Sequence, residues 1–409
     1  MRGRRWAFRL AAMLLGLAIP LGALEAYLRL TGVGGGFYEP DPVLGARHIP
    51  NRSGRWRKAC FDVPIRINSD GLRDVEHQRE KLPETVRIAV LGDSLAEALQ
   101  VPLEQSFPRR LEAMLNASGQ NPRAEVINFG VSGYGTDQEY LTLKTHAATY
   151  RPDVVVLAFT IGNDVRNNSP ALERQVSSYA KPFFRLDAEG RLVAVPFEAS
   201  RPSTAGVLGT IKAGLRYFRL YDFLVDWAHS NPSALAFLVR AGLIYGVPAP
   251  GPGVEARGGA EAVRLDYEVY LKEPDAAWAE AWRVTEALVR GANRETKRMG
   301  GRFVLVPIPS GIELAPAEAV AKAFPGSTPE RYDLAGPRRR LERIAETEGF
   351  DYVSVYDVFL RDLGGRHGKL EDLFFWCDGH LTPQGHQLVA EAIAAHIRRP
   401  ARAPAPHGS

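Results

Sequence analysis

The sequence contains one serine and one histidine whose surroundings suit nucleophilic catalysis. Ser94 follows an apolar stretch at residues 86–91, where a strand should turn into a helix. Such a turn exposes a side chain and leaves backbone N–H groups available for a developing negative charge. A serine hydroxyl is a weak nucleophile at neutral pH, so it needs a nearby base and a group that orients that base. His380 can be the base and Asp378, two residues earlier, can orient it.

The reach from Asp378 to His380 depends on the backbone between them. In an extended segment, residues two apart point to the same side, so the carboxylate would reach the second imidazole nitrogen. Two alternatives stay open: Asp372 can supply the carboxylate, or a serine and histidine pair can act without one. His386 is the weaker candidate for the base, because it falls inside a helix expected at 383–397.

The tetrahedral intermediate of acyl transfer also needs hydrogen-bond donors. Gly133 follows the second apolar stretch and permits close backbone approach, so its N–H can join that of Ser94. The amide of Asn163, after the third stretch, adds a side-chain donor. Gly130 and Gly135 compete with Gly133 for the donor role.

Short apolar runs with β-branched residues alternate with helical patterns over most of the chain. Continuous apolar strands suit a parallel sheet that helices cover on both faces. Ligands bind beyond the carboxyl ends of the strands in such a doubly wound sheet, where the candidate residues fall. The expected strands are 86–91, 125–129, 154–159, 303–307 and 352–355, and the expected helices include 107–115 (with Ser106 as N-cap), 275–299 and 383–397 (with Thr382 as N-cap).

Four blocks of this sequence resemble those of the SGNH hydrolases, which are also called GDSL hydrolases. They are GDSL at 92–95, INFGVSGYGTD at 127–137, IGND at 161–164 and DGHLTPQGH at 378–386. The resemblance covers residues 86 to about 397. It implies a flavodoxin-like, three-layer α/β/α fold with a five-stranded parallel sheet, and a serine esterase that needs no cofactor.

The resemblance also implies a role for each candidate residue. Ser94 would be the nucleophile and first oxyanion donor, Gly133 and Asn163 the other donors, and His380 the base with Asp378 as its partner. The better-known family pattern has the aspartate three residues before the histidine, whereas the separation is two here. The role of Asp378 is the one that this departure affects.

The first 30 residues predict an export signal. Arginines at positions 2, 4, 5 and 9 precede an apolar run at 10–24, which should leave the rest of the chain on the far side of the membrane. The run is shorter than the roughly 20 residues that span a bilayer, but residues 26–30 can lengthen it. We expect an uncleaved, single-pass transmembrane anchor at 1–30 and a periplasmic or extracellular domain. A cleaved signal peptide, which would make the protein secreted, is the alternative.

The remaining chain divides into three parts. A juxtamembrane linker and lead-in segment is expected at 31–85, with a short strand and turn at 61–71. The hydrolase domain spans 86–397 and contains an insertion at about 165–274, interpreted as a cap over the site. The tail at 398–409 is predicted to be disordered.

Composition excludes several classes of partner. The net charge of +4 owes much to arginines at the two ends of the chain, so no basic face for nucleic acid is indicated. No cysteine or histidine pair has metal-ligand spacing, and no GxGxxG or P-loop pattern is present, so no metal or cofactor is predicted. Cys60 and Cys377 can form a disulfide after export or remain free thiols.

Together these patterns predict hydrolysis of an oxygen ester through an acyl-enzyme. An exported enzyme meets polysaccharides and lipids. The expected substrate is therefore an acetyl or other short acyl ester of a carbohydrate. An O-acyltransferase acting on an extracytoplasmic polysaccharide would use the same triad. A non-catalytic binding partner in a cell-envelope complex is the alternative from another class.

Overall fold

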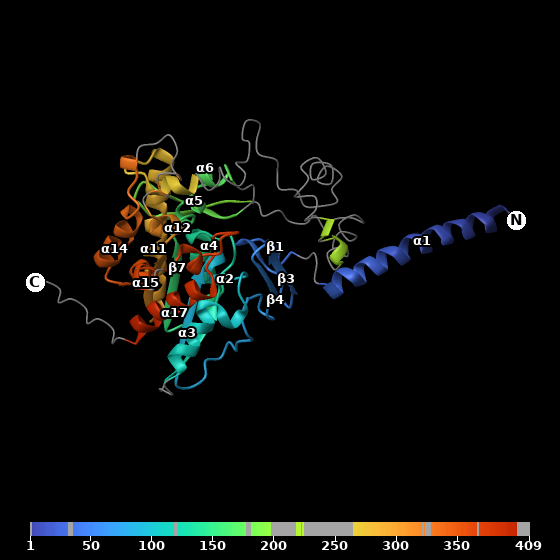
Figure 1. Ribbon diagram of the computed structural model, residues 1–409, viewed down its shortest axis with the longest axis horizontal. Helices are drawn as coiled ribbons and strands as arrows, with labels where there is room; N and C mark the ends of the chain where they lie inside the picture. Colours follow the sequence, from blue (N-terminus) through green and yellow to red (C-terminus); the bar gives the residue numbers. More distant parts are fainter. Residues whose placement is uncertain are drawn as a thin grey trace, which may run out of the picture.

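A five-stranded parallel sheet forms the centre of the computed structural model, which describes residues 2–31, 36–117, 122–176, 181–197, 218–221, 223–224, 265–316, 318, 320, 323, 329–365 and 368–398 (Figure 1). Its strands are β5 (Thr85–Gly92), β6 (Arg123–Asn128), β7 (Val154–Thr160), β10 (Arg302–Ile308) and β11 (Asp351–Tyr352). They lie in the order β11-β10-β7-β5-β6. Counted along the chain this is the order 2-1-3-4-5 of flavodoxin-like folds, whose ligands bind at the switch point between the first and third strands. Here that point lies between β5 and β7.

Alternate residues of the strands face two separate hydrophobic cores. In β5, Ala89 and Leu91 belong to one core, and Ile88 and Val90 belong to the other. The first core is covered by α4 (Thr136–Thr145), α11 (Ala276–Arg298) and α14 (Gly336–Glu348). The second is covered by α3 (Phe107–Asn116), α15 (Val355–Gly365) and α17 (Pro383–Ile397). The predicted three-layer α/β/α architecture is confirmed.

One of the two predicted helix caps forms: Thr382 accepts the N–H of Gly385 at the start of α17. Asp275, which was not predicted as a cap, accepts the N–H of Trp278 at the start of α11. Ser106 precedes α3 as predicted, but its hydroxyl donates to the carbonyl oxygen of Leu103 and caps nothing. A 3-10 turn directly before α3 supplies that competing acceptor.

The predicted strand at 352–355 is wrong in its second half. Strand β11 contains Asp351 and Tyr352 alone, although Val353 still donates its N–H to Leu305 of β10. Val355 instead begins α15 and is fully buried in the second core. This apolar residue at the edge of the sheet is therefore buried as part of a helix and not as part of a strand. The other four strands match their predicted ends within two residues.

Residues 36–84, which we call the arm, form two hairpins that pack on the domain. Strand β1 (Tyr38–Asp41) pairs with β2 (Gly45–His48), and β3 (Ser53–Lys58) pairs with β4 (Phe61–Arg66). Strand β4 lies where a short strand and turn were predicted at 61–71, whereas the residues expected to form a linker before it include the β1 and β2 hairpin. The turn between β1 and β2 is formed by an aspartate and a glycine: Asp41 accepts the N–H of Leu44, and Gly45 has a φ of +82°.

The N-terminal helix α1 (Arg2–Thr31) extends from the side of the molecule where the arm lies (Figure 1). Large apolar side chains along it are exposed, including Met13, Ile19 and Leu30. Among the described residues, no helix has both the length and the apolar character that a membrane crossing needs.

Much of the predicted insertion, and the tail from residue 399 onward, lie outside the described residues. Within the insertion, β8 (Phe183–Leu186) and β9 (Leu192–Val195) form a hairpin that packs against α4 and α11 through Phe184. The shorter elements are α2 (Ser94–Glu97), α5 (Asp164–Asn167), α6 (Pro170–Glu173), α12 (Gly311–Leu314), α16 (Leu370–Leu373) and 3-10 turns at Leu103–Gln105, Ala147–Tyr150, Glu268–Tyr270 and Pro329–Arg331.

Candidate active site

The turn after β5 presents Ser94 at the carboxyl edge of the sheet. Ser94 is half-buried and begins α2, which Asp93 caps by accepting the N–H of Leu95 at 2.9 Å. The first N–H groups of a helix have no intrahelical partner. In the described part of the chain the N–H of Ser94 has no hydrogen-bond acceptor, so it is available to a ligand.

The carboxylate of Asp93 joins the turn after β5 to the turn after β7. Its Oδ1 accepts the Thr160 hydroxyl at 2.9 Å, and its Oδ2 accepts the Asn163 amide at 3.1 Å. Burial raises the pKa of Asp93, although these bonds and the nearby His380 act in the opposite direction. An amide nitrogen has two hydrogens, so Asn163 is fixed beside the Ser94 turn with one N–H still free to donate.

Gly133 is the glycine of its loop whose N–H stays available. Its φ is +78°, a left-handed backbone that favours glycine, and a side chain there would meet nothing within 4 Å. The N–H of Gly130 instead donates to Asn128 Oδ1 at 3.0 Å, and that of Gly135 donates to Gln138 Oε1 at 3.4 Å. Of the three glycines that the sequence left in competition, the geometry favours Gly133 as the donor.

A tight loop between Phe374 and Leu381 contains Asp378 and His380. An antiparallel bridge joins the two ends of this loop. Gly379 reverses the chain between the two polar residues with a φ of +76°. Asp378 and His380 therefore meet across a turn, and the prediction that they lie along an extended segment is wrong.

The contact between Asp378 and His380 is an ion pair by distance. Asp378 Oδ2 lies 3.2 Å from His380 Nδ1, while Oδ1 accepts the His380 backbone N–H at 3.2 Å. The buried Nδ1 of His380 forms no hydrogen bond by geometry, so its contact with Asp378 is electrostatic. Burial acts to raise the pKa of Asp378, but His380 and Lys58 outweigh it and lower the pKa. The carboxylate is therefore ionised and faces the imidazole.

The alternative acid and the alternative base both have other roles. Asp372 is exposed, and its Oδ2 accepts the N–H of Lys369 at 2.8 Å at the start of α16. His386 is buried in α17, where its Nδ1 accepts the N–H of Phe107 at 3.3 Å. Burial lowers the pKa of His386 to about 3, and neighbouring positive charges add to the effect. These contacts leave Asp378 and His380 as the candidate pair.

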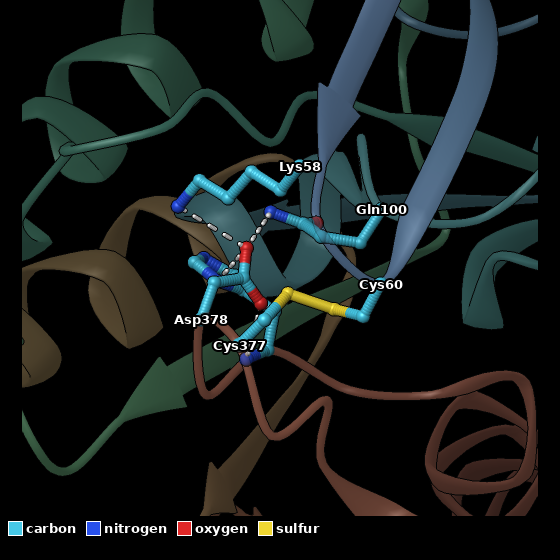
Figure 2. Close-up of a disulfide and its surroundings, with 6 residues drawn as sticks. Lys58, Cys60, Gln100, Cys377 and Asp378 are labelled. Atoms are coloured by element: carbon cyan, nitrogen blue, oxygen red, sulfur yellow. Dashed lines mark hydrogen bonds and ion pairs between the residues drawn. A yellow bond between two sulfur atoms is a disulfide. The ribbon is translucent and has the colours of Figure 1, made fainter.

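Several residues around Asp378 were not identified from the sequence. Lys58 Nζ lies 3.6 Å from Asp378 Oδ2, and Gln100 donates to the same oxygen at 3.5 Å (Figure 2). A disulfide joins Cys60 to Cys377, with 6.1 Å between the Cα atoms. The predicted export was the sequence signal that permitted this pairing, whereas nothing in the sequence pointed to Lys58 or Gln100. The arm is thus part of the site.

Ser94 and His380, both described, are not hydrogen-bonded to each other. A positive charge on His380 would lower the pKa of Asp93, the residue before Ser94, so the imidazole lies near the Ser94 turn. Catalytic hydrogen bonds are often long until a substrate is bound. Ser94 and Asn163 follow β5 and β7, so the candidate residues gather at the switch point of the sheet.

A separate cavity of about 350 Å³ lies between the arm and α4. Arg47, Arg79 and His146 are among its lining residues, and none of the candidate catalytic residues is. We place the site at the strand ends because the chemistry gathers there. Over the described ranges, no group of three or more histidine, cysteine or acidic side chains is arranged to hold a metal ion.

The Ser94 turn, the available donors and the acidic partner of a histidine are the parts that a hydrolase of ester bonds requires. Residues 90–284 match the model of the GDSL-like lipase and acylhydrolase family. Over these residues the chain is similar to that family. The matched span contains Ser94, Gly133 and Asn163 and ends before Asp378 and His380.

Solved structures with a similar fold include esterases. An acetyl xylan esterase, AlAXEase, is 12% identical with a TM-score of 0.37, and the alignment covers 76% of this chain and 100% of that one. The acetylxylan esterase Axe2 of Geobacillus stearothermophilus is 14% identical with a TM-score of 0.38, covering 79% and 100%. LAE5, an alpha/beta hydrolase from the metagenome of Lake Arreo, is 14% identical with a TM-score of 0.38, covering 76% and 94%. No curated protein sequence gives a significant match.

Proposed function

We propose that this protein is a serine esterase that works through an acyl-enzyme. The hydroxyl oxygen of Ser94 attacks the ester carbonyl carbon, and His380 takes the hydroxyl proton. The carbonyl oxygen becomes an oxyanion that the N–H groups of Ser94 and Gly133 and the amide of Asn163 bind. The intermediate then expels the alcohol, which receives the proton from His380. Water repeats these steps on the acyl-enzyme and releases the acid.

The observation that carries this proposal is the set of donors left without acceptors beside the Ser94 turn. The N–H of Ser94 and that of Gly133 have no acceptor among the described residues. Asn163 is held in place by Asp93 and keeps one N–H in reserve. Preorganised donors of this kind stabilise an oxyanion without moving during the reaction.

The proposed substrate is an acetyl or other short acyl ester of an extracytoplasmic carbohydrate. Two features support a location outside the cytoplasm. Arginines precede the apolar residues of α1, and a disulfide joins Cys60 to Cys377. Disulfides persist in oxidising compartments and are rare in the cytosol. We extend the proposal to membrane attachment through α1, whose apolar side chains are exposed.

A fluorophosphonate probe and a series of 4-nitrophenyl esters test the reaction. The purified protein should label on Ser94 and hydrolyse acetate faster than octanoate, while Ser94→Ala does neither. Absence of labelling, under conditions where a control esterase labels fully, would overturn the esterase proposal. Adding an acetylated and a deacetylated polysaccharide then separates acetate release from acyl transfer.

Cell fractionation tests the location. The full chain should sediment with membranes and stay there after carbonate washing, and detergent should release it. A variant with Ile19→Arg and Leu21→Arg in α1 should lose membrane association and keep its esterase activity. Equal fractionation of the two proteins contradicts attachment through α1.

A further inference from the structure

Glu97 is a buried carboxylate one helical turn after Ser94. Its side chain is fully buried, and its two oxygens divide their partners between two parts of the chain. Oε1 accepts the Tyr38 hydroxyl at 2.7 Å and faces His48 Nε2 at 2.5 Å. Oε2 accepts the Ser132 N–H at 2.9 Å and the Ser132 hydroxyl.

The partners keep this carboxylate ionised. Burial acts to raise the pKa of Glu97, but His48, Ser132 and Tyr38 outweigh it and lower the pKa. An ionised carboxylate accepts hydrogen bonds and donates none, so all four contacts are donor to acceptor. His48 is fixed in turn, because its Nδ1 lies 3.1 Å from the carbonyl oxygen of Gly71. A buried charge that lost any of these partners would be costly.

The contact with Ser132 acts on the peptide that precedes Gly133. Val131 to Tyr134 form a turn, closed by the Tyr134 N–H donating to Val131 O at 3.2 Å. Gly133 occupies its third position with a φ of +78°, as in a type II turn. Type I and type II turns differ by a flip of their central peptide, here the one between Ser132 and Gly133. That flip would turn the Gly133 N–H away from its present direction.

We propose that Glu97 is a positioning residue that holds this peptide in the orientation that aims the Gly133 N–H at the oxyanion. Glu97 accepts both the N–H and the hydroxyl of Ser132 and so fixes this residue, which lies on the N-terminal side of the peptide. On the far side, Asn167 donates to the carbonyl oxygen of Gly133 at 3.2 Å. This inference rests on the proposed esterase function.

The arm is therefore needed for the oxyanion donors as well as for the acid. Tyr38 and His48 belong to the β1 and β2 hairpin and hold the other oxygen of Glu97. Arg73, which is also in the arm, donates to the Glu97 carbonyl oxygen at 2.7 Å and so fixes the end of α2. The arm acts on Gly133 through Glu97.

A double-mutant cycle on the full chain tests the role of Glu97. Glu97→Gln places an NH₂ group against donors, so kcat for 4-nitrophenyl acetate should fall at least 10-fold, towards the roughly 10²–10³-fold of a deleted oxyanion donor. KM should change by less than about threefold, because a donor aimed at the oxyanion acts in the transition state. Ser132→Ala should lower kcat less, since its N–H remains bound. The double variant should be no worse than Glu97→Gln alone, because both changes break one contact.

Glu112→Gln is the matched control. Glu112 also accepts a backbone N–H, that of Val126 at 2.8 Å, but it does so between α3 and β6. The Glu112→Gln variant should be less stable than the wild type and keep the wild-type kcat. If Glu97→Gln does not fold, Ser132→Ala still carries the test, because it keeps the Ser132 N–H contact with Glu97 and should fold with a lower kcat at unchanged KM.

The outcomes separate this inference from the esterase proposal. A wild-type protein that neither labels nor hydrolyses overturns both. An active wild-type protein whose Glu97→Gln variant keeps its kcat and loses only stability overturns the role of Glu97 alone. If the fold-loss in kcat of the double variant equals the product of the two single losses, the inference is also overturned, because Glu97 and Ser132 then act separately.

Discussion

The disulfide between Cys60 and Cys377 joins two segments that lie 317 residues apart in the chain. One is the turn of the β3 and β4 hairpin, and the other is the loop that holds Asp378 and His380 (Figure 2). Lys58, on the same hairpin, lies 3.6 Å from Asp378 Oδ2. The bond therefore holds the arm against the acidic partner of the proposed base.

Reduction of this disulfide should lower both activity and stability. Without the covalent link the hairpin and the histidine loop can separate, and a displacement of about 1 Å can cost on the order of 10²-fold in rate. We expect dithiothreitol to lower kcat/KM at least 10-fold and the free energy of unfolding by about 2–4 kcal/mol. A variant with both Cys60→Ser and Cys377→Ser should match the reduced protein and ignore the reductant. Full activity of that variant would contradict a role for the bond.

Asp378→Asn and Asp372→Asn should differ sharply in their effect on turnover. Asp378 faces His380, whereas Asp372 is exposed and caps α16. By analogy with other serine hydrolases, loss of the orienting carboxylate costs up to about 10⁴-fold in kcat. The Asp372 variant should remain within about twofold of the wild type. Steady-state kinetics on 4-nitrophenyl acetate measure both, and a larger loss in the Asp372 variant would reverse the assignment.

The sheet was predictable because each strand is a continuous apolar run followed by a polar turn. Parallel strands buried on both faces have that pattern, and the candidate residues after β5 and β7 fall at adjacent strand ends for the same reason. The run after Tyr352 misled, since Val355 is equally buried in α15. Burial alone does not separate a short edge strand from a helix start.

The arm was not predictable in the same way. Its role depends on contacts between residues distant in sequence, such as Tyr38 with Glu97 and Lys58 with Asp378. Glycine and proline near its start indicate turns, but a turn does not reveal what it packs against. Gly379 shows the same limit on a smaller scale. Its positive φ brings Asp378 to His380 by a route that residue spacing does not reveal.

Glu139→Gln should change how stability depends on pH. Burial, followed by the negative charges of Asp93 and Asp137, raises the pKa of Glu139 well above its ordinary value of 4.5. The folded state then holds a proton that the unfolded chain releases above about pH 4.5, so this residue lowers the free energy of unfolding as pH rises. The amide does not titrate. The melting temperature of the variant relative to the wild type should therefore be higher at pH 8 than at pH 5, and a constant difference contradicts the shifted pKa.

Gly133→Ala and Gly190→Ala form a matched pair that separates backbone strain from catalysis. Both glycines are exposed, with φ values of +78° and +75°, and at neither would a Cβ meet an atom within 4 Å. A non-glycine residue in this left-handed conformation costs about 1–2 kcal/mol. Both variants should therefore lose similar stability in urea or thermal unfolding.

Turnover should respond to one member of this pair alone. Relief of the strain at residue 133 turns the peptide whose N–H is the proposed oxyanion donor, so kcat should fall about 10-fold or more. Gly190 lies in the turn between β8 and β9, where its N–H donates to Asp187 O at 3.0 Å, and its variant should keep the wild-type kcat. Equal kcat values in the two variants would mean that the Gly133 N–H does not bind the oxyanion. The donors would then be Ser94 and Asn163, which Asp93 holds through its contacts with Leu95 and with the Asn163 amide.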